Sequence, residues 1–116
     1  MAKLEREIPG YYDFDEVLCY LHNRILDSSL SASYENGSEY CWGDVRCAVR
    51  VYERYTILGD NRLSLTVMLA GHGNQLYLSG ITAAGSGGVG KIIPWGEEEF
   101  LNVLEKLADQ LTGQNN

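Results

Sequence analysis

Residues 45–55 read VRCAVRVYERY, the longest strand-like run in the chain, in which valine or cysteine alternates with a set of residues that includes three arginines. Successive side chains of a β-strand point to opposite faces, so this alternation predicts a strand with two different faces. Three valines and Cys47 lie on one face. The other face carries Arg46, Ala48, Arg50, Tyr52 and Arg54. Because a charged face of an antiparallel sheet usually points to solvent, we expect the arginine face to be the outer face of the sheet.

The same period of two continues on both sides of this stretch, from residue 30 to residue 84. We expect strands at 30–34, 39–42, 45–57, 63–70 and 75–83, separated by short turns. Asn36 and Gly37 both tolerate positive φ, so they are expected to form a tight hairpin turn. Short connections between successive strands predict an antiparallel meander.

Helical patterns flank these strands. Asp13 and Glu16 have the spacing of a capping box, and apolar residues at helical spacing predict a helix over 14–27. Three glutamates at 97–99 favour the positive end of a second helix, over 97–111, and Gly113 is a suitable terminator. Before the first helix, residues 3–8 alternate as a short edge strand would, and Pro9 closes it.

These patterns predict an α+β fold: an antiparallel meander of about five to six strands with two amphipathic helices packed on one face. The predicted order is β-α-β-β-β-β-β-α. Residues 1–112 are expected to form a single domain, and residues 113–116 a disordered tail.

The chain has 116 residues and a formal net charge of -7. An acidic surface repels the phosphate backbone, so nucleic acid is not an expected partner. No apolar run has the length of a membrane span or of a signal sequence, and no membrane partner is expected. The three scattered cysteines do not resemble a secreted disulfide framework, which favours a cytoplasmic location.

Residues 84–92, AGSGGVGKI, nearly match a phosphate-binding loop. Ile92 stands where a magnesium-binding hydroxyl is needed, and Pro94 disfavours a helix directly after the loop. We therefore interpret the glycines as a backbone bend and expect no nucleotide site. An alternative remains, in which backbone N–H groups of Gly85, Gly87 and Gly88 bind a simple anion beside Lys91.

The arginine face offers a second candidate site. Arginines in a row can hold a carboxylate or phosphate, or form an interface between copies of the chain. The residues proposed for this role are Arg46, Arg50, Tyr52, Arg54 and Tyr77. The alternative is an ordinary solvated face. The eight tyrosines of the chain favour two interpretations equally: a binding surface or pocket wall, or positions at the edge of the core in strands.

Metal and catalytic motifs are not recognisable. Cys19, Cys41 and Cys47 lack the tight paired spacing of a zinc site and are expected to be small buried residues. Two distant histidines and no nucleophile elbow give no readable triad. We expect no metal and no cofactor, and favour a protein that is not an enzyme.

Three segments carry a resemblance to a known family: GDVRCAVRVYERY (43–55), LYLSGITAAGSGG (76–88) and WGEEEFL (95–101). They resemble an uncharacterised family of short bacterial proteins, a domain of unknown function found mostly in Gram-positive gut and soil bacteria. The resemblance spans nearly the whole chain. It implies a stand-alone cytosolic bacterial protein, with no activity or site residues to carry over.

The predicted order of elements is also similar to a shortened helix-grip fold, the architecture of lipid-transfer and pollen-allergen proteins. That resemblance implies an apolar ligand between the sheet and the last helix. This chain is shorter, has one helix where two often follow the first strand, and carries its glycine-rich segment late.

Three functions follow as hypotheses. The first is a non-enzymatic protein that binds a small apolar or anionic ligand, or a protein partner. Its pocket would lie between the sheet and the C-terminal helix and would be lined by Trp95, Phe100, Leu104 and residues 85–90. The second is a homo-oligomer, such as a homodimer, that uses the arginine and tyrosine face. The third is an enzyme that acts on a small organic anion.

Overall fold

The computed structural model describes residues 1–56, 61–85 and 95–113. Its elements are β1 (Ala2–Ile8), α1 (Phe14–Asp27), β2 (Ser33–Trp42), β3 (Val45–Tyr55), β4 (Arg62–His72), β5 (Gln75–Gly85) and α2 (Trp95–Thr112). The predicted α+β class, the antiparallel sheet and the two helices are confirmed. The predicted tail lies outside the described residues except for Gly113.

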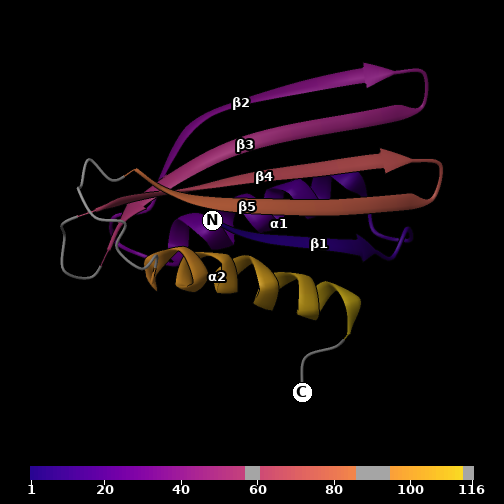
Figure 1. The fold of residues 1–116 in the computed structure, drawn as a ribbon. Helices are drawn as coiled ribbons and strands as arrows, with labels where there is room; N and C mark the ends of the chain where they lie inside the picture. The colour runs from indigo at the N-terminus through magenta and orange to yellow at the C-terminus, as the bar shows by residue number, and fades with distance from the viewer. Residues whose placement is uncertain (57–60, 86–94, 114–116) are drawn as a thin grey trace.

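The strands form one antiparallel sheet in the order β1-β5-β4-β3-β2. Strands β2 to β5 follow one another as a meander, and β1 joins the free side of β5. Figure 1 shows the helices together on one side, with α2 along the β1 side of the sheet and β2 farthest from it. The helices therefore cover one face of the sheet, and none of the elements in the described ranges lies on the other face.

The tight turns lie at Gly43 and Gly73, whose φ angles are 63° and 60°. Glycine adopts positive φ without a steric penalty, and a glycine that opens a two-residue loop matches the twist of a hairpin. The predicted hairpin at Asn36 and Gly37 is wrong. Both residues lie inside β2, where the pairing with β3 shifts between Tyr34 and Asn36. That shift is a bulge, so the polar residues bend one long strand and do not end it.

Helix α1 has the predicted ends, whereas α2 begins at Trp95, two residues before the predicted start, and ends at Thr112, one residue after the predicted end. The Asp13 carboxylate accepts a hydrogen bond from the Glu16 backbone N–H at 3.0 Å, which satisfies a free donor in the first turn of α1. Gly113 follows α2 with a φ of 74°. The left-handed conformation at this position is a common end to a helix.

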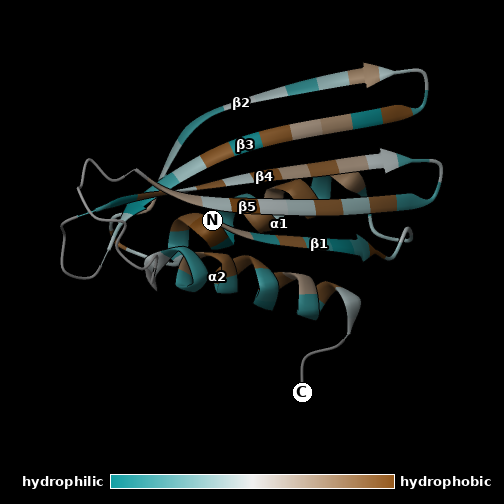
Figure 2. Cartoon of the chain, in the orientation of Figure 1, coloured by the Kyte–Doolittle hydropathy of each residue, from teal (hydrophilic) through white to brown (hydrophobic). Residues whose placement is uncertain are grey.

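The core lies between the helices and four neighbouring strands, β1, β5, β4 and β3. Alternate residues of β4 point into it: Leu63, Leu65, Val67 and Leu69 are all buried. Strand β5 adds Leu76 and Leu78, and α2 adds Phe100 and Leu104. Figure 2 shows hydrophobic and hydrophilic residues alternating along α2, as its one-sided packing requires.

Candidate functional site

The structure reverses the predicted orientation of β3. Arg46, Arg50 and Arg54 pair across the ladder with Gly71, Val67 and Leu63 of β4. Residues directly opposite in a ladder share a face, so the arginine face is the helix-covered face. The prediction of an outer arginine face is wrong because Ala48 and Tyr52, which alternate with the arginines, are buried core residues.

Arg46 is held by two contacts from α1. Its guanidinium makes two hydrogen bonds to the Asp15 carboxylate, at 2.9 and 3.0 Å, and lies 4.2 Å from the centre of the Phe14 ring. The hydrogen bonds from Arg46 lower the pKa of Asp15, and those to Asp15 raise the pKa of Arg46. Arg46 thus ties β3 to the start of α1, and an acid of the chain already occupies its bidentate donors.

The other two arginines also have partners within the chain. Arg50 lies 3.7 Å from a carboxylate oxygen of Glu39 and stands over the Tyr34 ring. Arg54 lies 4.6 Å from the centre of the buried Phe100 ring, and burial lowers its pKa. These contacts support a structural role for the arginine row, in which the stems cover apolar surface at the margin of the core.

A histidine–tyrosine pair lies on the same face. Nδ1 of His22 and the buried Tyr52 hydroxyl are 2.8 Å apart, and the Tyr34 ring packs edge-on to the imidazole. Burial, and then the Arg50 charge, lower the pKa of His22, so its imidazole is neutral at pH 7. Burial raises the pKa of Tyr52, which is likewise neutral. This cluster joins α1 to β2 and β3.

The predicted ligand pocket lay between the sheet and α2. Phe100 and Leu104 do lie there, and both are completely buried. Leu104 reaches so close to Gly80 that a Cβ at that glycine would stand 2.2 Å from the leucine Cδ2. Gly85 ends β5 and Trp95 begins α2, while Gly87, Gly88 and Lys91 lie outside the described residues.

The face of the sheet without helices, here called the open face, carries the other half of each alternation. In the middle of this face Val49 pairs with Met68, and Val51 pairs with Thr66, which in turn pairs with Ile81. The apolar residues that share this face are Tyr40, Trp42, Val45, Cys47, Val49, Val51, Tyr55, Met68, Ala70, Tyr77, Ile81 and Ala83. Tyr77 is therefore separated from the arginines with which it was predicted to act.

Two aromatic side chains project from one corner of the open face. Tyr40 and Trp42, near the end of β2, are 69% and 77% exposed. They alternate with Glu39 and Cys41 in the sequence. Such alternation indicates a strand, but it does not show that Tyr40 and Trp42 are the exposed residues of that strand. Only the register with β3 and the position of the helices show that these rings lie on an uncovered face.

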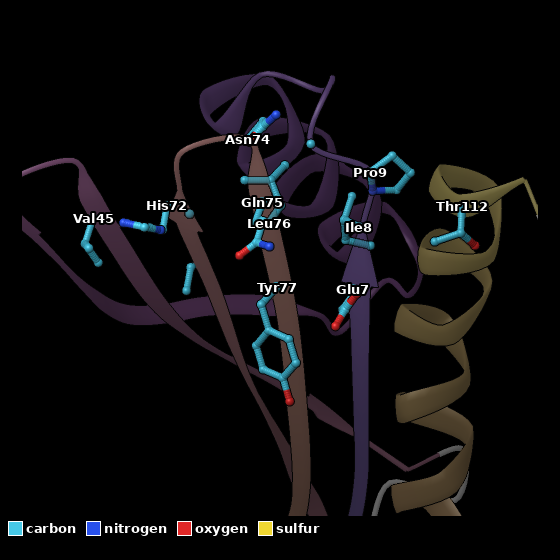
Figure 3. Close-up of a pocket in the computed structure, with 13 residues that line it drawn as sticks. Glu7, Ile8, Pro9, Val45, His72, Asn74, Gln75, Leu76, Tyr77 and Thr112 are labelled. Atoms are coloured by element: carbon cyan, nitrogen blue, oxygen red, sulfur yellow. The ribbon is translucent and has the colours of Figure 1, made fainter.

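A hollow lies at the same end of the sheet, on the side of β1 and β5. Its volume is about 620 Å³. Figure 3 shows Tyr77, Gln75 and Glu7 along it, with Ile8 and Pro9 beside them. The described residues that line it also include Val45, Ala70, His72, Leu76 and Thr112. Burial first, and then the Glu5 carboxylate, raise the pKa of Tyr77, so its hydroxyl stays protonated and can donate a hydrogen bond.

Charge is distributed unequally between the two layers. Helix α2 alone carries five acidic residues and one lysine, and α1 carries three acids and one arginine. Across the open face of β3, β4 and β5, all of it described, the acidic and basic residues are Glu53, Arg62 and His72; Glu53 and Arg62 form an ion pair with each other, and His72 lies 3.5 Å from Asp44. Strand β1 adds Lys3, Glu5 and Glu7 at one edge of this face. The acidic surface is thus the helical one, and the open face is nearly neutral.

The cysteines differ from the prediction. Cys19 and Cys41 are exposed and Cys47 is partly exposed, so none is a fully buried residue. Cys19 lies outside the apolar stripe of α1, and Cys41 lies on the edge strand β2, opposite Arg46. Within the described ranges, the side chains form no cluster of three or more groups suited to a metal ion. None of the helices in those ranges is long and apolar enough to cross a membrane.

A search of curated proteins finds no match to the chain. A family model does match, over residues 1–112, and its description reads "Family of unknown function (DUF6054)". The matched range includes every described strand and helix. The chain therefore belongs to the DUF6054 family, whose function is unknown.

Proposed function

We propose that the protein is a non-enzymatic interaction protein that works as a homodimer, with the open face as the contact. The observation that carries the proposal is a sheet face on which no described helix lies and on which apolar side chains outnumber charged ones. Large exposed apolar patches on a small protein commonly mark an interaction surface. The acidic helices would point away from each other into solvent.

The size of the open face supports a stable contact. Three of its five strands have 11 residues. With a rise of about 3.3 Å per residue and a spacing of about 4.8 Å between strands, the face covers roughly 800 Å². A stable interface of standard size buries about 800 Å² on each partner. One copy of the face is therefore enough to form such an interface with another.

The distribution of acidic residues supports a second copy of the chain as the partner that covers the open face. The chain as a whole is strongly acidic, so two copies repel each other unless their contact keeps the acids apart. Contact through the open face does so, because the acids of α1 and α2 lie on the opposite layer. A twofold contact also needs a patch that complements itself, and a neutral apolar sheet meets this condition.

The location fits the same proposal. The resemblance to short bacterial proteins and the three cysteines, which form no disulfide, support a bacterial cytoplasmic protein. In this setting the fold would present one acidic helical surface on each side of the dimer.

The test is the mass of the protein in solution, measured by sedimentation and native mass spectrometry over a range of concentrations. We expect a dimer that Val49→Glu converts to a folded monomer, because the new carboxylates would face an apolar sheet. The control is Leu30→Glu, which adds the same charge at an exposed loop residue away from the sheet. A wild-type protein that is monomeric at all concentrations would overturn the proposal.

A further inference from the structure

We infer that the twofold axis of this dimer runs along β4, and that Tyr40 and Trp42 of each copy insert into the hollow of the other. The inference rests on the proposed dimer and adds its geometry. It follows from three features of the open face: where its exposed aromatic rings lie, where its hollow lies, and which charges border it.

The register of the sheet places the rings and the hollow at the same end. One row across the open face runs from Tyr40 through Cys47, Ala70 and Tyr77 to Glu7. The exposed ring therefore stands at one end of the row, and Tyr77 and Glu7, which line the hollow, stand at the other. Trp42 belongs to the next row, which ends at His72 and Gln75.

A twofold axis between two facing sheets must lie in the plane of contact. If it runs along the central strand β4, it exchanges the two sides of the sheet and keeps each end in place. Strand β4 of one copy then faces β4 of the second copy. In the same way, β3 faces the second copy's β5, and β2 faces the second copy's β1. The projecting rings of one copy consequently stand over the hollow of the other, twice in the dimer. Facing sheets commonly pack with strands about 30° apart, which this axis allows.

The side chains that meet in this arrangement are complementary. Tyr40 faces Glu7 of the second copy, and its hydroxyl can donate to that carboxylate. In the middle of the face Val51 meets Ile81, and Met68 meets its own copy near the axis. Lys3 and Glu5, the charged residues at the β1 edge, meet the polar Asn36 and Ser38 at the β2 edge.

An axis across the strands gives a poorer fit. It would place β1 on β1 and reverse the ends, so that Glu5 faces its own copy and Val45 faces the Glu53 carboxylate. Charges alone do not separate the two axes, because the axis along β4 brings Arg62 opposite its own copy, although each Arg62 is paired with Glu53 of its own chain. The position of the aromatic rings does separate them. The exposed ring of Trp42 would lie over the polar end of the sheet, where Ser33 pairs with Glu53.

The hollow is large enough for the proposed occupants. Pockets of about 300–1,000 Å³ hold ligands of drug size, which exceed one aromatic side chain. The hollow, at about 620 Å³, falls within this range. Its apolar lining on the open face comes from Val45, Ala70 and the Tyr77 ring, which suits the faces of the rings. Buried tryptophan and tyrosine are the residues that most often dominate the energy of an interface.

The experiment uses chemical cross-linking between single cysteines in the full chain. The background carries Cys19→Ser, Cys41→Ser and Cys47→Ala and is first shown to be dimeric. Facing sheets lie about 10 Å apart, which is too far for a direct disulfide, so a short bis-maleimide is used. Met68→Cys should cross-link to its own copy. Val49→Cys should not, but it should cross-link to Ser79→Cys when the two variants are mixed.

The second measurement is the dissociation constant of Trp42→Ala, which should rise at least about tenfold. Its control is Leu30→Ala, an apolar truncation at an exposed residue away from the open face. Efficient self-cross-linking of Val49→Cys would overturn the axis along β4, and an unchanged constant for Trp42→Ala would overturn the insertion. In both cases the dimer would still stand. A monomeric wild-type protein would instead contradict the proposed function itself.

Discussion

Single residues explain why the arginine row is not an outer face. Arg46 and Arg54 place their guanidinium groups over Phe14 and Phe100, and Arg46 is paired with Asp15. An arginine can cover apolar surface with its stem and keep its charged end near water. The alternation in residues 45–55 predicted the strand correctly, but both of its faces contain apolar residues. The sequence could not tell which face the helices cover, because that depends on elements distant in the chain.

His22 gives a prediction at the scale of one residue. Burial and the Arg50 charge lower its pKa in the folded state, whereas its pKa in the unfolded chain is about 6.5. Below about 6.5 the unfolded state therefore binds the proton more readily, and stability falls as the pH falls. We expect the melting temperature to drop between about pH 7.5 and about pH 5.5, and His22→Gln to reduce that drop.

The matched control for this prediction is His72→Gln, since His72 is an exposed histidine at the end of β4. Both variants are compared in the Val49→Glu background, so that self-association does not contribute. The drop should persist in His72→Gln. An equal drop in His22→Gln would show that the contact between His22 and Tyr52 does not control the acid sensitivity.

At the scale of elements, β2 shows what local sequence signals can and cannot predict. Asn36 and Gly37 have the composition of a hairpin turn, yet no residue of β2 has positive φ. The pairing with β3 determines the conformation of Asn36 and Gly37, because β3 continues past this point and pairs with β2 on both sides of the bulge. A Cβ at Gly37 would lie 2.5 Å from the Tyr34 hydroxyl, so glycine serves close packing here rather than a turn. At residues 71–74 the sequence predicted the turn that is found at Gly73, whereas Gly43 and Asp44 indicated only a bend or bulge where the structure has a tight turn.

The contact between β5 and α2 gives a prediction at the element scale. Gly80→Ala should lower the free energy of unfolding by about 1–3 kcal/mol, because the new methyl group meets Leu104. Leu104→Ala should cost about 2–5 kcal/mol through the cavity that it leaves. Since the second change makes room for the first, the double variant should lose less than the sum of the two losses. Chemical denaturation measures all three variants, and strict additivity would mean that these residues do not compete for the same space.

At the scale of the whole molecule, the family match covers residues 1–112 but supplies no activity. What distinguishes the molecule is the contrast between its two surfaces. The helical surface is acidic, and the open face is nearly neutral and apolar. Composition gave the sum of these charges, but only the arrangement of the layers shows that they are separated. That separation could not be predicted while the orientation of β3 was unknown.

The three cysteines allow the open face to be tested without any substitution. Cys47 lies on that face, whereas Cys41 pairs with Arg46 on the helix-covered face and Cys19 is exposed on α1. A dimer through the open face shields Cys47 alone, so its alkylation by iodoacetamide should slow as the protein concentration rises. Cys19 and Cys41 should react at constant rates and serve as internal controls, with mass spectrometry of peptides as the readout. Val49→Glu should abolish the shielding. If Cys41 were shielded and Cys47 were not, the contact would instead lie on the opposite face of β2, and the open face would have to be abandoned as the interface.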